Sequence, residues 1–502
     1  MMARSHGRSA RRGAPRTGVA RSGRARRPVS PPSAETTPHQ RSEPVRKPVH
    51  NPARRPAADS PETPMSPVSP GSPESGTPAT PAPRGARAWW RRAMGGDGPR
   101  PGEPATLTYY ALLLSTLFLL LFGLVMVFSV QSVTVAAQGQ DAFTEFAKYL
   151  IFAVVGLAGM AAIAHAPVRL LKRIAVPTLI LASLGQILVY APGVGSCVGG
   201  NCNWVRVPGI GTIQPSEFIK LALCLYLGVV VTTRRDIFLP GVDTWRKLGR
   251  LAGWIFAPVV LAVVLVLGGG DLGTVVVLAL LVAGALWMGG LGRRWFVALG
   301  GLGLGAFALL SALSYNRRAR ILAWWRPDDG DMYDVGYQPK HGRWALGTGN
   351  LWGVGPGSSR QKWGYLTQAD SDYIFAVLGE EFGLIGTLIV IALFAVIGWC
   401  CARIIRRSRS LYVSVVTGGL MAWIVGQALI NMSVVVGLLP VLGVPLPLIS
   451  KGGSSLVSVL MGIGVLLALA RNEPGAPEAL RASGAAVRRT LAVIAPRRRN
   501  RA

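Results

Sequence analysis

Long runs of apolar residues, separated by short polar segments, dominate the chain between residues 106 and 472. A helix needs about 20 residues to cross the roughly 30 Å hydrocarbon core of a bilayer. Ten runs approach that length, so the pattern predicts an all-α, polytopic membrane domain with ten transmembrane helices. The predicted spans are residues 107–130, 149–166, 174–190, 218–232, 251–267, 274–289, 295–313, 373–400, 411–432 and 447–470.

Polar, basic segments flank this domain. Residues 1–105 are rich in Arg, Pro, Ser and Gly and hold too few aliphatic residues to offset the entropy lost on folding, so we expect a disordered tail. Residues 473–502 form a second basic tail. Such tails could bind nucleic acid, anionic lipid or a protein. We favour a solvated cytoplasmic tail and expect membrane lipid, but no nucleic acid, among the partners.

Composition and charge fit this arrangement. The chain is 50% hydrophobic and only 15% charged, against about 25% in soluble domains, which excludes a soluble enzyme. Basic residues concentrate in alternate loops, and the positive-inside rule then places both termini in the cytoplasm. The four inner loops hold Arg169, Lys172, Arg173, Arg234, Arg235, Arg246, Lys247, Arg250, Arg293, Arg294, Arg403, Arg406, Arg407 and Arg409, whereas the first three outer loops hold only Lys148 and Arg206.

The outer loop between the seventh and eighth spans, residues 315–372, breaks this rule. Its aromatic residues argue against disorder, and a loop of this length is usually functional. Its basic side chains suit an anionic substrate such as a lipid-linked phosphate. The alternative is an outer lid that pairs its own charges, since the loop also holds Asp residues. The basic residues are Arg317, Arg318, Arg320, Arg326, Lys340, Arg343, Arg360 and Lys362.

Ionisable residues near membrane depth are functional candidates because burying them is costly. Gln214 and Glu217 open the fourth span, and Lys220 lies at i+3 from Glu217, so the two charges can pair on one helix face. Two interpretations stay open, a substrate cavity and a structural ion pair. Asp271 is expected to cap the sixth span.

Two further segments carry polar groups at span ends. Asp370 and Asp372 lie at the outer mouth of the eighth span, where repulsion should raise one pKa and could tune a general base. The alternative is that Ser371 or Asp372 only caps the helix. Residues 445–455 contain two Pro, two Gly and three Ser, including Ser454 and Ser455, which suggests an unwound start of the tenth span facing a polar cavity.

The cysteines and the absence of certain motifs limit the kinds of chemistry expected of the chain. Cys197 and Cys202 lie in the second outer loop and could close a disulfide there. The sequence contains no Walker-type phosphate loop, zinc-ligand spacing or nucleophile elbow. The chemistry is therefore not expected to be driven by nucleotides, and the metal, if there is one, is not identified by the sequence.

Four motifs in order resemble the SEDS family (shape, elongation, division and sporulation), over about residues 106–473: segments 214–220, 355–362, 372–383 and 445–455. The resemblance implies a peptidoglycan glycosyltransferase of the cytoplasmic membrane that polymerises lipid II, an undecaprenyl-pyrophosphate disaccharide-peptide, on the outer face. It also implies a class B penicillin-binding transpeptidase as partner. The motifs look most like the branch that works at the division septum with divisome proteins, with the elongation branch as the alternative.

The resemblance also implies site residues. The family's essential Asp matches Asp372, its cavity Glu and Lys match Glu217 and Lys220, and its outer-loop Trp matches Trp204. Asp372 is the expected base, taking the proton from the attacking sugar hydroxyl. Lys362 or Lys220, with a divalent cation (Mg²⁺ or Mn²⁺) as a further candidate, would offset charge on the pyrophosphate. The expected substrate-binding residues are Trp204, Gln214, Glu217, Lys220, Lys362, Ser454 and Ser455.

The chain departs from the family pattern beside this site. Asp370 stands where the family usually has His, and Lys451 stands where an aromatic residue often precedes Gly-Gly-Ser-Ser. Asp370 is expected to modulate the pKa of Asp372.

Two rival functions remain: a lipid II flippase, and a non-catalytic scaffold that activates the transpeptidase. A flippase favours midplane charges and two similar halves, and the sequence shows no clear repeat.

Overall fold

The computed structural model describes residues 106–482, except residues 136–138, 140, 199–200, 210, 236–248, 251 and 327–335. The predicted N-terminal tail, residues 1–105, lies outside the described residues, as do residues 483–502 of the predicted C-terminal tail.

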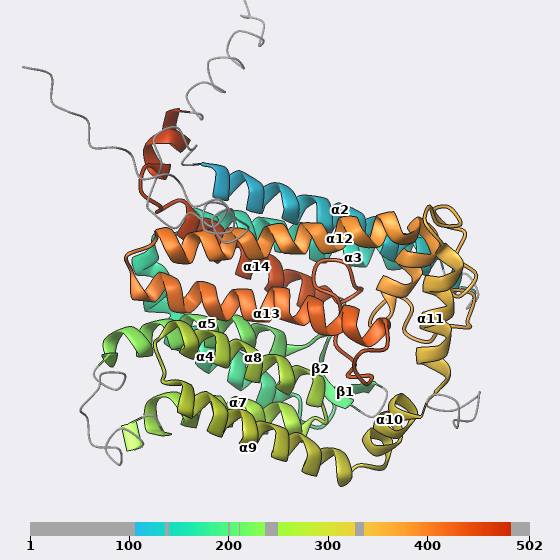
Figure 1. The fold of residues 1–502 in the computed structure, drawn as a ribbon, viewed down its shortest axis with the longest axis horizontal. Helices are drawn as coiled ribbons and strands as arrows, with labels where there is room; N and C mark the ends of the chain where they lie inside the picture. The colour runs from blue at the N-terminus through green and yellow to red at the C-terminus, as the bar shows by residue number, and fades with distance from the viewer. Residues whose placement is uncertain are drawn as a thin grey trace, which may run out of the picture. The chain divides into compact units, whose positions relative to one another are not determined.

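Helices make up most of the described chain, and each predicted apolar run coincides with one of them (Figure 1). Short loops join most neighbours, so consecutive helices run back and forth. The helices of the apolar runs are α2 (Leu107–Thr134), α3 (Ala142–Ala164), α4 (Val168–Leu188), α5 (Pro215–Thr233), the π-helical turn η3 (Ala252–Phe256) with α7 (Ala257–Gly268), α8 (Leu272–Met288), α9 (Arg293–Ala312), α12 (Ile374–Arg407), α13 (Leu411–Val435) and α14 (Gly453–Ala470).

Within the described residues, eight of these helices are long and apolar enough to cross a membrane. The other two, Gly253–Gly268 and Leu272–Met288, are apolar but shorter. The protein is therefore a multi-pass membrane protein, with eight candidate spans by length and composition.

The interior is built from α5, α13 and α14, which bury most of their residues, whereas α9 buries only Ser311. Helix α14 packs against α3 and α5, and α13 packs against α8, α5 and α12. Close approach needs small residues: a Cβ on Gly284 of α8 would lie 2.7 Å from the carbonyl oxygen of Gly418 of α13. Polar side chains on the three interior helices consequently meet one another, away from lipid.

A small antiparallel sheet corrects the prediction of an all-α fold. It has the strand order β1 (Gly195–Val198), β2 (Asn201–Val207), β3 (Gly211–Ile213), with Ser196 opposite Trp204 and Val205 opposite Ile213. The pattern of apolar runs does not predict this sheet because its strands are short and half polar. Only β-branched residues such as Val205 and Val207 favour extended backbone there.

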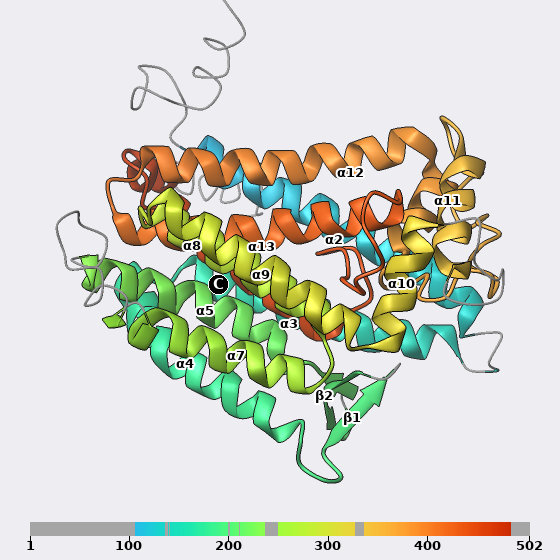
Figure 2. The ribbon, with the colours of Figure 1, turned by 60° about the horizontal axis from the view of Figure 1, so that its bottom comes forward.

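The outer loop predicted at residues 315–372 is partly helical. It contains α10 (Tyr315–Trp325) and α11 (Tyr337–Gly349), and α11 packs against α12 and α13. Figures 1 and 2 show α10, α11 and the sheet at the same end of the helices. The sheet and the two helices of this loop therefore gather at one end of the helical domain.

Helix α12 is broken near its start, which the predicted continuous span did not anticipate. Gly383 has φ 66° and ψ −162°, a backbone conformation that residues other than glycine rarely adopt. The backbone groups freed by this kink bond to the preceding loop: Val354 N–H donates to the Glu380 carbonyl at 2.9 Å, and Leu384 N–H donates to the Asn350 carbonyl at 2.8 Å. The two sides of the kink are thus fixed to the loop.

The residue after the predicted boundary at 472 contacts the helices. Glu473 is buried and forms an ion pair with Arg407 at the end of α12, Nε to Oε2 3.1 Å. Thr108, at the start of α2, donates a hydrogen bond to the same carboxylate at 3.2 Å. This contact joins the two ends of the helical domain.

Candidate functional site

Asp372 lies in the turn immediately before α12, with its backbone tightly held. Asn431 of α13 donates through Nδ2 to the Asp372 carbonyl at 2.7 Å. The carboxylate accepts only a weak bond from Ser371 Oγ at 3.2 Å among the described contacts. A Cβ on Gly443, which has φ +70°, would lie 3.5 Å from the carboxylate, so the segment before α14 passes directly beside it. The carboxylate is thus positioned but not occupied by strong donors.

Burial raises the pKa of Asp372 to about 6, well above the ordinary value for a carboxyl group. Bonding to Ser371 and the charge of Arg320 oppose this rise, and the carboxylates of Asp271 and Asp370 add to it. The expected role of Asp370 is therefore a minor one. Its charge is offset by an ion pair with Lys451, Nζ to Oδ2 2.9 Å.

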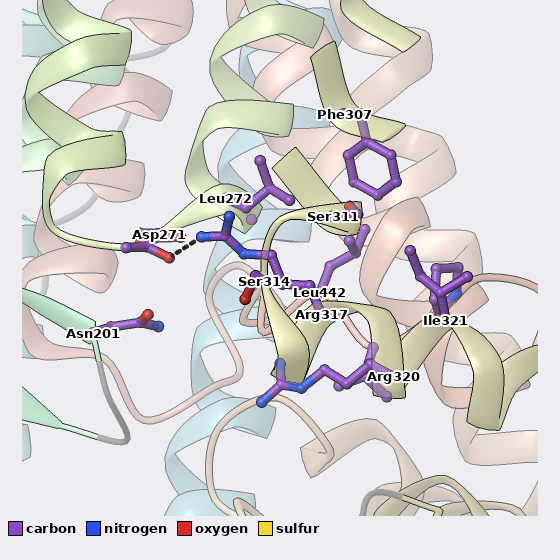
Figure 3. A pocket seen from close by; sticks show the side chains of 14 residues that line it. Asn201, Asp271, Leu272, Phe307, Ser311, Ser314, Arg317, Arg320, Ile321 and Leu442 are labelled. Atoms are coloured by element: carbon purple, nitrogen blue, oxygen red, sulfur yellow. Dashed lines mark hydrogen bonds between the residues drawn. The ribbon is translucent and has the colours of Figure 1, made fainter. Parts of the chain in front are cut away.

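A cavity of about 190 Å³ opens between the start of α8, the α9–α10 corner and residues 440–442. Asp372 is not among its lining residues, but its carboxylate lies next to Gly443, the residue after this lining segment, and the charges of Arg320 and Asp271 in the lining act on it. Figure 3 shows Asn201 and Asp271 on one side of it and Arg320 on the other, with the Arg317 side chain extending across towards Asp271. Arg317 donates to the Gly270 carbonyl at 2.9 Å. The buried hydroxyl of Ser311 also lines the cavity and has no hydrogen-bond partner among the described residues. The cavity therefore offers cationic and polar groups to a ligand.

Asp271 joins this cavity to the motif at the start of α5. It caps α8 as expected, accepting from Thr274 N–H at 2.8 Å and from Thr274 Oγ1 at 2.6 Å. Gln214 donates through Nε2 to the same carboxylate at 3.1 Å, and the Gln214 N–H donates to Ser454 Oγ at 3.1 Å. The structure thus joins Gln214 and Ser454 to the Asp271 carboxylate, although neither residue lines the cavity. Ser455 is buried one residue further along α14.

Glu217 and Lys220 form a buried ion pair, Nζ to Oε1 2.8 Å, with exposed side-chain fractions of 2% and 1%. Lys220 also donates to Gln427 Oε1 at 3.1 Å and lies over the ring of Trp423, and Ser458 donates to Glu217 at 3.3 Å. Neither charge lines the cavity. This arrangement favours the structural alternative over direct contact with a substrate.

Two amides on α13 connect this ion pair to Asp372. Gln427 accepts from Lys220 and donates to the Pro445 carbonyl at 2.8 Å. One turn later, Asn431 donates to the carbonyls of Val444 and Asp372, both at 2.7 Å. Sequence reasoning did not select Gln427 and Asn431, although two amides at i and i+4 within an apolar span were a usable signal.

Lys362 lies elsewhere, and the expectation that it faces the pyrophosphate is not met in this structure. Its side chain is 1% exposed, and Nζ contacts Glu381 Oε1 at 2.9 Å, Ser129 Oγ at 3.0 Å and the Gly357 carbonyl at 2.6 Å. All three of its protons are thereby used. Glu380 next to it accepts from the N–H groups of Arg360 and Gln361 at 3.1 and 3.3 Å. Glu380 and Glu381 thus anchor the Gly-rich loop, residues 353–362, on α12.

Trp204 lies on β2, half-buried, and does not line the cavity. Its strand is tied to the cavity wall by its neighbours. Cys202 N–H and Asn203 Nδ2 both donate to the Gly269 carbonyl, at 2.8 and 2.9 Å. The structure pairs Cys197 with Cys202 in a disulfide, which closes this hairpin.

Comparison with known proteins gives this arrangement a context. Residues 110–474 match the model of the FtsW/RodA/SpoVE family, described as a cell cycle protein. The chain is 32% identical over 381 residues to the probable peptidoglycan glycosyltransferase FtsW of Mycobacterium tuberculosis, covering 76% of this chain and 71% of that protein. It is 35% identical over 361 residues to the stage V sporulation protein E of Bacillus subtilis, covering 72% and 96%.

Solved structures share the fold. A chain of a peptidoglycan synthase complex superposes with a TM-score of 0.58 at 23% identity, covering 72% of this chain and 97% of that one. The rod shape determining protein RodA of Thermus thermophilus superposes with a TM-score of 0.52 at 22% identity, with the same coverage. The extent of the family match and the identity to these relatives show that the chain belongs to the FtsW/RodA/SpoVE (SEDS) family.

Proposed function

We propose that this protein is a peptidoglycan glycosyltransferase that polymerises lipid II at the outer face of the cytoplasmic membrane, in septal wall synthesis during division. Family membership and the names of its FtsW relatives support the activity and the septal role. The observation that carries the proposal is Asp372, a carboxyl group with a pKa of about 6 that lies next to Gly443. The preceding residues 440–442 line a cavity together with Arg317 and Arg320, and the charge of Arg320 acts on Asp372.

The chemistry follows from this placement. A carboxylate whose pKa lies near the working pH is a suitable general base, so Asp372 takes the proton from the attacking sugar hydroxyl. The hydroxyl oxygen bonds to the anomeric carbon with inversion, and the lipid pyrophosphate leaves. Arg317 and Arg320 replace Lys362 in our proposal as the groups that offset the charge on the pyrophosphate, because guanidinium groups pair well with phosphate oxygens.

A divalent cation fits this site only together with the substrate. Among residues 106–482, apart from the gaps in the description, no three His, Cys, Asp or Glu side chains gather as a metal site. Mg²⁺ commonly binds one or two carboxylates plus substrate phosphates. Asp372, whose carboxylate accepts only the Ser371 bond among the described contacts, would hold such an ion against the pyrophosphate, where it would supply charge neutralisation.

We further propose that all ten apolar helices span the membrane, with both termini in the cytoplasm. The basic residues of the inner loops support this orientation. It places Asp372, the cavity and the outer loop at the outer surface, where a class B penicillin-binding transpeptidase would receive the new glycan. The similarity in fold to a chain of a peptidoglycan synthase complex agrees with such a partner.

The test is polymerisation of lipid II by the purified protein together with its transpeptidase partner. Asp372→Asn keeps the size of the side chain but cannot accept a proton, so we expect glycan synthesis to fall by about 10²–10⁴-fold. Asp141→Asn is the matched control, because Asp141 is an exposed helix cap at the start of α3. A normal rate for Asp372→Asn would contradict the base assignment. Absence of polymer from the unmodified protein with its partner would contradict the activity.

A further inference from the structure

A second charged pair lies next to the base. Lys451 Nζ lies 2.9 Å from Asp370 Oδ2, and the two side chains are 39% and 22% exposed. The residues come from segments far apart in the chain, Asp370 from the turn before α12 and Lys451 from the turn before α14. The same two residues are also joined through the backbone, because the Lys451 N–H donates to the Asp370 carbonyl at 2.7 Å.

This contact is one of a series. Three consecutive carbonyls, those of Asp370, Ser371 and Asp372, accept hydrogen bonds from Lys451 N–H, Ser450 Oγ and Asn431 Nδ2, at 2.7, 2.8 and 2.7 Å. The Ser450 hydroxyl is itself fixed, because it accepts from the Leu446 N–H at 2.7 Å. The backbone that carries the base is therefore held at every residue, while the carboxylate of Asp372 is left for chemistry.

We propose that Asp370 and Lys451 are positioning residues, a charged clasp that locks the Asp372 turn to the segment before α14. This inference rests on the proposed function, in which Asp372 is the base. Beside the three carbonyl bonds, the Asp370–Lys451 ion pair adds a contact between opposite charges that joins the same two turns. It reinforces the first bond of the series, in which the Lys451 N–H donates to the Asp370 carbonyl.

If the Asp370–Lys451 pair positions Asp372, its loss has different effects than if the pair only tunes the pKa of Asp372. The charged groups that act on Asp372 include Arg320 from α10, Asp271 from the start of α8 and Asp370. If the pair acted only through charge, loss of Asp370 would lower the pKa of Asp372 and loss of Lys451 would raise it. If the pair is a clasp, loss of Asp370 and loss of Lys451 both reduce activity, because either loss releases the turn that carries Asp372.

The experiment measures polymerisation of lipid II, as kcat and KM across pH, for Asp370→Asn, Lys451→Gln and the charge-exchanged double variant Asp370→Lys/Lys451→Asp. A misplaced catalytic group loses rate more than ground-state affinity. We expect each single variant to lose roughly three- to tenfold in kcat, with KM within about twofold and no opposite pH shifts. The exchanged pair should recover at least half of the loss. Glu145→Gln, which breaks the exposed pair with Lys148 on α3, is the control.

A second measurement does not depend on activity. Amide hydrogen exchange of peptides covering residues 366–378 should be faster in both single variants than in the unmodified protein, at an unchanged melting temperature in detergent. Unchanged exchange together with normal kcat in both single variants would overturn the proposal. So would pH profiles displaced in opposite directions. If the unmodified protein makes no polymer, the proposed function fails, whereas the exchange measurement still tests the clasp.

Discussion

Asp372 has the two properties that a general base needs, a fixed backbone and a carboxylate in a partly dry environment. Burial contributes most to its raised pKa, ahead of the charges of Asp271 and Asp370. Repulsion between neighbouring carboxylates, the cause expected from the sequence, is therefore secondary. The surrounding apolar segments tune the group more than its acidic neighbours do.

This pKa sets the pH dependence of the reaction. Only the carboxylate accepts a proton, so activity should be lost as pH falls through about 6, not through the usual carboxyl range near 4. The acid limb of kcat/KM for lipid II measures this value in the free enzyme. Arg320→Gln should move the limb to higher pH, because the Arg320 charge lowers the pKa of Asp372. A limb near pH 4 would contradict the assignment.

The buried pair of Glu217 and Lys220 should act on stability. Breaking a buried ion pair leaves one charge unpaired and costs about 3–5 kcal/mol, whereas replacing both charges is often close to neutral. We expect Glu217→Gln to lower the unfolding temperature in detergent, and the double variant Glu217→Gln/Lys220→Met to recover much of it. Loss of polymerisation at an unchanged unfolding temperature would instead support the substrate-cavity interpretation.

The hairpin of β1 and β2 supports one wall of the cavity. Cys202 and Asn203 hold the Gly269 carbonyl, and Gln186 of α4 donates to Asn203 at 2.9 Å. The turn that these bonds fix runs directly into Asp271, which lines the cavity. A change in the hairpin should therefore reach the site.

Removal of the disulfide tests this coupling. For so short a loop, cross-linking contributes at most about 2 kcal/mol through the unfolded state. Cys197→Ser/Cys202→Ser should lower the unfolding temperature slightly and reduce polymerisation, and reductant should have the same effect on the unmodified protein only. Alkylation of membranes before reduction measures the bond directly. Two reactive thiols there would show that the disulfide is absent in the cell envelope.

At the level of the complete chain, the helical domain of residues 106–482 holds every described site residue. The tail of residues 1–105 lies outside the described residues, and its composition offers no core. Catalysis should therefore depend on the helical domain alone.

Deletion of residues 1–85 should leave polymerisation and the unfolding temperature unchanged, because the deleted segment has too little apolar surface to pack. Its effect is expected on localisation or partner choice, which fluorescence imaging of tagged protein in dividing cells would show. Loss of folded protein after the deletion would mean that the tail is structural.

Properties that depend on local sequence were predictable. A run of apolar residues forms a helix in lipid whatever its neighbours are, because each backbone group must bond within its own segment. All ten helical segments, the cap at Asp271 and the i, i+3 pairing of Glu217 with Lys220 follow from such short-range patterns. The motifs around Gln214, Lys362, Asp372 and Ser455 were sufficient to indicate the family.

The partners of the remaining polar groups depended on packing between distant segments. Lys362 was assigned to a substrate, yet Glu381 of α12 and Ser129 of α2 both contact it. Lys451 and Asp370 looked like two separate departures and proved to be one ion pair. A buried charge pairs with whichever opposite charge the packing of the helices brings within reach. The order of residues along the chain does not reveal which partner that is.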